Sequence, residues 1–161
     1  MIDELQEEVQ AALDSELYVV ALTAALAIPD ICGALESETG RATGENYRRW
    51  YSDNLAAKYR WLAPEDCYQL RCSMLHQGRS ATRNYSRIVF TAPGPITFHN
   101  NIMDDTLNLD IVTFCQDIMA AASAWLQRSE ETAVVQANLA HLMRWRPDGL
   151  APYVVGVPVL S

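Results

Sequence analysis

Lysine is nearly missing from this chain of 161 residues, which has one Lys, eleven Arg and a formal net charge of −8. Such an acidic balance argues against general, charge-driven binding to nucleic acids or anionic membranes. The few bases are concentrated. Residues 1–40 carry nine acids and no Lys or Arg, whereas residues 41–87 carry nine bases and four acids. Arginine favours bidentate contacts to phosphate or carboxylate, although codon usage explains an Arg excess equally well.

Histidine and cysteine are also sparse. The three His lie far apart and the four Cys are scattered, with no H-x-x-x-H or C-x-x-C spacing, so no metal site and no cofactor are predicted. The G-x-S-x-G, Walker and G-x-G-x-x-G patterns are missing as well. Cysteines among apolar neighbours, without a signal peptide, are typical of reduced thiols in a cytoplasmic protein. The apolar run 17–28 is too short to span a bilayer, so no membrane contact is expected.

Half of the residues are hydrophobic, which is enough for a substantial core, and the length predicts a single domain, 1–161. Apolar residues recur at helical spacing over most of the chain, so the predicted fold class is mainly α. Pro29 is expected to interrupt the first helix. The predicted helices are 2–28, 31–35, 45–60, 64–78, 111–127 and a last one capped by Ser129 that ends near 144.

Two segments depart from the helical pattern. Residues 85–91, 96–99 and 106–110 have strand character and predict a small β-hairpin or meander insertion near residues 85–110. The tail 149–161 is apolar and contains two prolines. It is too short to fold alone and is expected to lie on the bundle or on a partner chain.

The helix predicted from Pro64 has a start signal, with Pro64 followed by two acids, and a stop signal at Gly78. Arg71 and His76 both lie on it, roughly 140° apart around an ideal helix. A histidine exchanges protons near neutral pH and an arginine holds phosphate, so together they could cleave RNA through its own 2′-hydroxyl. The alternative from spacing alone is structural: Arg71 pairs with an acid of the first helix, such as Asp14 or Glu16, and His76 caps the helix end.

Aromatic residues and arginines alternate in the helix 45–60. Trp50 and Tyr51 could stack on bases while Arg48 and Arg49 bind phosphates. The interpretation favoured here is that the aromatic residues belong to the core and the arginines are solvated.

The stretch Leu70-Arg71-Cys72-Ser73-Met74-Leu75-His76-Gln77-Gly78 resembles the Arg-x(4–6)-His motif of the HEPN superfamily. Those proteins are small helical bundles, and many are ribonucleases of toxin–antitoxin, abortive-infection and other defence systems. The acidic first helix is similar to the long helix that packs beside the motif in that family.

This resemblance implies a homodimeric, metal-independent endoribonuclease. His76 would be the general acid or base, and Arg71 would hold the scissile phosphate. Ser73 would be a polar auxiliary, and Arg79 and Arg83 would guide the RNA. An antitoxin or a nucleotidyltransferase would be a further partner. Two alternatives stay open: a non-catalytic HEPN module that binds a nucleotide or a protein, and a purely structural helical bundle.

Overall fold

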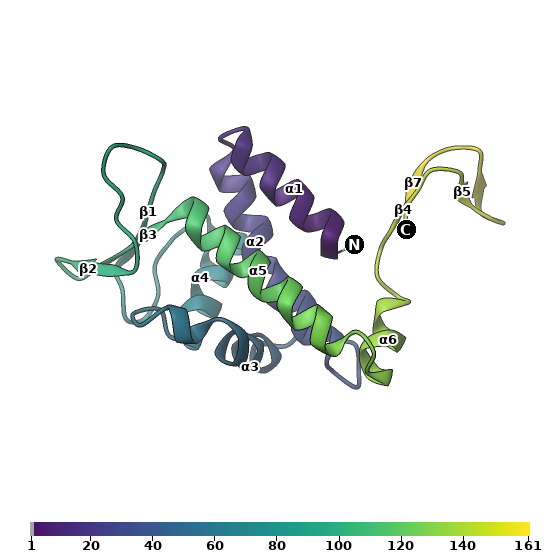
Figure 1. Ribbon diagram of the computed structural model, residues 1–161, viewed down its shortest axis with the longest axis horizontal. Helices are drawn as coiled ribbons and strands as arrows, with labels where there is room; N and C mark the ends of the chain where they lie inside the picture. Colours follow the sequence, from purple (N-terminus) through teal and green to yellow (C-terminus); the bar gives the residue numbers. More distant parts are fainter. Residues whose placement is uncertain (1) are drawn as a thin grey trace.

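The computed structural model describes residues 2–161 and is mainly α-helical, as the sequence predicts (Figure 1). Around the long helices α2 and α5 lie the others. The helices are α1 (Ile2–Asp14), α2 (Tyr18–Leu35), α3 (Gly44–Asn54), the 3-10 turn η1 (Ala56–Lys58), α4 (Pro64–Gln77), α5 (Ile111–Ser129) and α6 (Ala133–Leu139). The strands are β1 (Arg87–Thr91), β2 (Asn101–Met103), β3 (Thr106–Asp110), β4 (Trp145–Arg146), β5 (Gly149–Leu150), β6 (Val154–Val155) and β7 (Val159–Leu160).

The expectation of one helix over 2–28 is wrong, because the chain turns between α1 and α2. Glu16 adopts a left-handed conformation with φ of 58°, and the amide of Leu17 donates to the carbonyl of Ala12 at 2.8 Å. The predicted break at Pro29 is wrong too, since Pro29 lies inside α2. The separate helix 31–35 is therefore the last part of α2, and α1 folds back against it as an antiparallel neighbour (Figure 1).

Helix α2 is the centre of the bundle and packs against α1, α3 and α5. It is long and apolar enough to meet the criteria for a membrane span, but 56% of its 18-residue window is buried inside the fold. Burial of an apolar helix face is what the core of a helical bundle requires. Its first turn is the exception, since Val19 and Val20 are exposed.

The aromatic residues of α3 belong to the core, as the favoured interpretation predicts. Tyr47, Trp50 and Tyr51 are fully buried, and Trp50 meets Trp125 of α5 edge to face at 6.4 Å between ring centroids. Helix α3 ends at Asn54, before the predicted end at residue 60. The short 3-10 turn η1 follows it. Nothing aromatic on α3 remains available for stacking on bases.

The β segment forms a three-stranded sheet with the order β1-β3-β2. Strands β2 and β3 form a hairpin inside the predicted β insertion, although β2 is not among the predicted strands, and β1 pairs with β3 in parallel, with Ile88 opposite Leu107. The sheet is therefore no meander, and residues 96–99 are not a strand. Strand β3 leads directly into α5, whose first turn is capped by the carboxylate of Asp110 accepting from the amide of Thr113 at 2.8 Å.

The last helix, α6, is shorter than predicted and follows Thr132 rather than Ser129. Beyond it, residues 145–160 form two small two-stranded ladders that project from the bundle beside the N-terminal end of α1 (Figure 1). Trp145 and Leu160 line a hollow with Glu4, Glu7 and Glu8 of α1. Most other apolar side chains of the segment stay exposed, and Tyr153 is 82% exposed.

Candidate functional site

Helix α4 carries both residues of the Arg-x4-His pair, and its boundaries are set locally as predicted. Pro64 occupies the first turn with Glu65 and Asp66 beside it, and Gly78 ends the helix in a left-handed conformation with φ of 63°. A glycine adopts that conformation without steric cost, so the chain can leave the helix directly after His76 and Gln77.

Arg71 is directed toward α2 and forms an ion pair with Asp30. Its Nε lies 2.5 Å from Asp30 Oδ2, and the side chains are 22% and 11% exposed. The predicted structural partners, Asp14 and Glu16, are not the acids in this pair. Burial raises the pKa of Asp30, and the Arg71 guanidinium offsets part of that effect. Burial acts to lower the pKa of Arg71, but the carboxylate of Asp30 outweighs it, so Arg71 stays a cation.

The ion pair with Asp30 uses only the Nε donor of the Arg71 guanidinium group. Nε donates to Asp30, and Nη1 lies 4.0 Å from Cys72 Sγ, a weak contact. Among residues 2–161, Nη2 of Arg71 has no hydrogen-bond partner. The Asp30 pair thus fixes the orientation of the side chain and leaves a donor free.

His76 lies in the last turn of α4 and is exposed. Within the part of the chain that the structure describes, its imidazole has no hydrogen bond and no ion pair. It therefore does not cap the helix through a side-chain bond, as the structural alternative supposed. The structure places Arg71 at the bundle surface facing α2 and His76 in solvent, so one copy of the chain does not enclose both in a cleft.

The other three predicted site residues lie on α4 or on the segment that follows it. Ser73 is half-buried and its hydroxyl donates to the carbonyl of Ala81 at 3.0 Å, while the amide of Arg79 donates to the carbonyl of Ser73 at 3.1 Å. The side chains of Arg79 and Arg83 are exposed and carry no ion pair within residues 2–161. Arg79 and Arg83 lie on a loop that leads into β1, so with Arg87 they form no helical face.

That loop is held against the first half of α4 by Asp66. The buried carboxylate of Asp66 accepts from Thr82 Oγ1 at 2.8 Å and from Asn84 Nδ2 at 3.0 Å. Gln69 adds a third bond by accepting from the amide of Arg83 at 2.7 Å. These contacts fix the backbone of the loop that carries Arg79 and Arg83, while the two arginine side chains extend into solvent.

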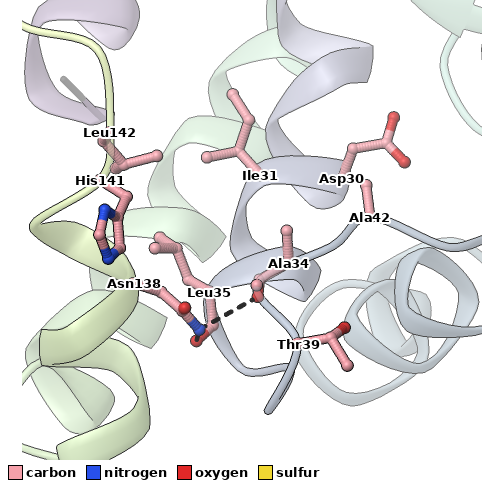
Figure 2. A pocket seen from close by; sticks show the side chains of 10 residues that line it. Asp30, Ile31, Ala34, Leu35, Thr39, Ala42, Asn138, His141 and Leu142 are labelled. Atoms are coloured by element: carbon pink, nitrogen blue, oxygen red, sulfur yellow. Dashed lines mark hydrogen bonds between the residues drawn. The ribbon is translucent and has the colours of Figure 1, made fainter.

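Asp30 also lines a cavity of about 440 Å³ that the sequence did not reveal (Figure 2). Figure 2 shows Asp30 and Ala42 at one end and His141 and Leu142 at the other. Between them lie Ile31, Ala34, Leu35, Thr39, Gly40 and Asn138. The sequence signal for this site was a single acid, Asp30, in an otherwise apolar stretch.

Asn138 of α6 lines this cavity and links α6 to the end of α2 through hydrogen bonds. Its Nδ2 donates to the carbonyls of Leu35 at 2.9 Å and Ser37 at 2.8 Å, and lies 3.5 Å from that of Ala34. Three carbonyls around one nitrogen fix the orientation of the amide, so Oδ1 is the atom left to accept a hydrogen bond. Gly40 approaches so closely that a Cβ there would lie 2.8 Å from Oδ1.

Two further observations limit the chemistry. Among residues 2–161, no group of three or more His, Cys, Asp or Glu side chains could hold a metal ion. Comparison of the chain with protein-family models, with curated proteins and with solved structures finds no match.

Proposed function

We propose that this protein is a HEPN-type, metal-independent endoribonuclease that works as a cytoplasmic homodimer. The observation that supports this best is the state of the Arg-x4-His pair on α4. Arg71 is oriented by Asp30 with a free Nη2 donor, and His76 is exposed without a partner within residues 2–161. Arg71 therefore keeps a donor for a phosphate group, and no contact within the described residues holds the His76 side chain away from a substrate.

The chemistry needs two proton transfers and one fixed positive charge. In the proposed reaction, one imidazole takes the proton of the 2′-hydroxyl, and that oxygen attacks phosphorus. The bond to the 5′-oxygen breaks, and a second imidazole returns a proton to the leaving oxygen. The products are a 2′,3′-cyclic phosphate and a free 5′-hydroxyl. Arg71 stabilises the charge on the phosphoryl oxygens through its free nitrogen.

A homodimer supplies what a single copy lacks. Because one chain offers one His76 on an open surface, two copies meeting at the ends of their α4 helices would place two imidazoles beside two arginines. Arg79 and Arg83, without acid partners within residues 2–161, would attract the RNA backbone at that edge. Ser73, whose hydroxyl is bound to Ala81, would keep the loop of these arginines in place. By the same resemblance, an antitoxin or nucleotidyltransferase would be a partner.

The test is cleavage of single-stranded RNA by the purified chain in EDTA, with the products analysed for a cyclic phosphate. His76→Ala should abolish cleavage, while Gln77→Ala, at the neighbouring exposed position, should retain it. Arg71→Lys keeps the positive charge near Asp30 but loses the planar guanidinium, and should reduce cleavage strongly without unfolding the protein. If every RNA stays intact, or if His76→Ala cleaves like the wild type, the proposal fails.

A non-catalytic HEPN module is the second candidate, and the Asp30 ion pair favours it. In that case Arg71 serves the fold and the cavity beside Asp30 serves a ligand. This alternative predicts thermal stabilisation by a nucleotide without turnover of RNA.

A further inference from the structure

We propose that the groove between α1, the middle of α2 and the β4–β7 ladder binds a cationic amphipathic segment of a partner protein. Such a segment carries arginine or lysine side chains beside an apolar anchor. No residue of α4 lines this groove. The inference therefore goes beyond the proposed ribonuclease site and does not depend on RNA cleavage.

Two adjoining hollows make up the groove. The first has a volume of about 570 Å³ and lies between α1 and the β4–β7 ladder, where Trp145 is paired with Leu160. The second, of about 300 Å³, shares Glu4, Glu8 and Leu160 with the first and continues between α1 and α2. The groove is thus acidic at one end and apolar at the other. The apolar end adds Leu5, Ala24, Ala27, Ile31 and Met143 to the lining.

Apolar surface stays uncovered on the ladder side of the groove. Trp145 is 58% exposed and Leu160 is 61% exposed, although both line the hollow beside α1. Met143, which lines the second hollow, is 54% exposed. An uncovered indole next to contiguous apolar side chains is typical of an interaction surface. An apolar side chain of a partner that entered the groove would cover all three residues.

The charge on the α1 side selects a cationic partner. Glu4, Glu7 and Glu8 are three and four residues apart, so they share one face of the helix, where like charges repel one another. Within residues 2–161 the side chains of Glu7 and Glu8 have no hydrogen bond and no ion pair. The helix dipole favours the acids of the first turn, Asp3 and Glu4, but Glu7 and Glu8 lie beyond that turn.

The arginines beside Trp145 in the sequence do not offset this charge. Arg144 Nη2 donates to the carbonyl of Leu139 at 3.0 Å, and Arg146 Nε donates to Ser161 Oγ at 2.8 Å. Neither arginine lines the groove. The groove therefore repels RNA phosphates and attracts cations. An indole beside carboxylates also suits a guanidinium, which stacks on the ring while it pairs with an acid.

A protein segment fits the two ends of the groove better than a small cation does. A free polyamine would pair with the carboxylates but would leave the apolar end beside Ile31 uncovered. A helical segment presents residues three and four positions apart on one face. It can therefore direct an apolar anchor to Ile31 and a cation to Glu7 or Glu8 at the same time.

The direct test is fluorescence anisotropy of the full chain with a labelled helical peptide that has leucines on one face and arginines along its borders. Two altered peptides replace the arginines by citrulline or the leucines by serine. We expect the first peptide to bind and each altered peptide to bind at least roughly tenfold more weakly. Equal binding of the citrulline peptide, displacement by equimolar spermidine, or no binding at roughly millimolar concentration would overturn the proposal.

Charge variants test the location. The double variant Glu7→Gln, Glu8→Gln should bind the arginine peptide roughly threefold to tenfold more weakly. Asp104→Asn with Asp105→Asn is the matched control, because it changes the net charge equally at an exposed turn outside the groove. Both aspartates have positive φ, which asparagine tolerates. Equal affinities of the two double variants would contradict the assignment.

The aromatic side of the groove is tested in the same assay. Trp145→Ala should weaken peptide binding roughly tenfold, because it removes the exposed indole. Trp61→Ala is the control, since Trp61 is 38% exposed and lines neither hollow. Unchanged binding by Trp145→Ala would contradict the assignment.

A second copy of the chain is the alternative occupant, and sedimentation velocity distinguishes it. We expect the wild type and Trp145→Ala to have the same mass, with and without the arginine peptide. A dimer that either the substitution or the peptide dissociates would overturn the proposal, because the groove would then hold another copy. These measurements do not involve RNA, so loss of binding here and absence of RNA cleavage are separate results.

Discussion

The two halves of α4 differ in almost every physical respect. Residues 64–70 are embedded in the bundle, with Asp66, Cys67 and Leu70 buried, whereas Leu75, His76 and Gln77 are exposed. The first half is bound to the loop after the helix through Asp66 and Gln69, and Arg71 at the boundary is bound to Asp30. One half fixes the helix in the fold, and the other presents its side chains to solvent.

The largest contrast should come from one substitution made in both halves. Leu70→Ala removes a fully buried side chain and should lower the free energy of unfolding by about 2–5 kcal/mol. Leu75→Ala, at a position that is 37% exposed, should cost less than about 1 kcal/mol. Urea denaturation of both variants measures the difference. Equal losses would mean that the two halves are equally packed.

Removing the Asp66 carboxylate, which holds the loop after α4 against the helix, should cause the next largest loss of stability. Asp66→Ala leaves Thr82 and Asn84 without their acceptor and should cost about 1–3 kcal/mol. Glu65→Ala is the matched control, because Glu65 forms a surface ion pair with Arg48 at 3.2 Å and should cost less than about 1 kcal/mol. Thermal unfolding distinguishes the two, and a Glu65→Ala variant less stable than Asp66→Ala would contradict this account.

A smaller effect is expected at the end of the helix. Gly78→Ala places a side chain at φ of 63° with no neighbouring atom within 4 Å of the new Cβ, so its cost is conformational alone. We expect a loss of about 1 kcal/mol in unfolding free energy. Gly156→Ala, also at positive φ in open space, is a control in the projecting C-terminal segment. A stabilised Gly78→Ala variant would show that the helix end is not held as described.

The two cysteines of α4, Cys67 and Cys72, allow the two halves of the helix to be compared without any substitution. Cys67 is fully buried, and burial raises the pKa of its thiol to about 12, so almost no thiolate exists at pH 8. Cys72 is half-buried. Brief treatment with iodoacetamide followed by mass spectrometry should find Cys72 modified before Cys67, Cys32 and Cys115. Earlier labelling of Cys67 would indicate that the first half opens readily.

The sequence was informative where structure is decided locally. Pro64, the acids after it and Gly78 predict α4 to within a residue of its ends, because first-turn chemistry and a left-handed glycine act over a few residues. The turn between α1 and α2 was missed because Glu16 adopts a left-handed conformation without a glycine or proline to signal it. Pro29 was expected to end a helix, but the buried side chains around it, Ile28 and Cys32, hold α2 together.

The parts of the site that were missed depend on long-range pairing. An acid partner for Arg71 was expected in the first predicted helix, and the assumed break at Pro29 removed Asp30 from that set. The cavity joins α2 to Asn138, more than a hundred residues away, and no local pattern marks such a meeting. The parallel pairing of β1 with β3 was overlooked because nearby strands are usually antiparallel.

That parallel pairing has a consequence for the order of folding. Strand β1 follows the loop that leaves α4, and β3 leads directly into α5. The parallel pairing of β1 with β3 therefore brings the segment after α4 next to the segment that begins α5. A parallel pair requires the whole connection, residues 92–105, to run back before the first bond forms. Helix α4 can therefore form early from its local signals, whereas the β1–β3 ladder forms only after the chain up to β3 has run back beside β1.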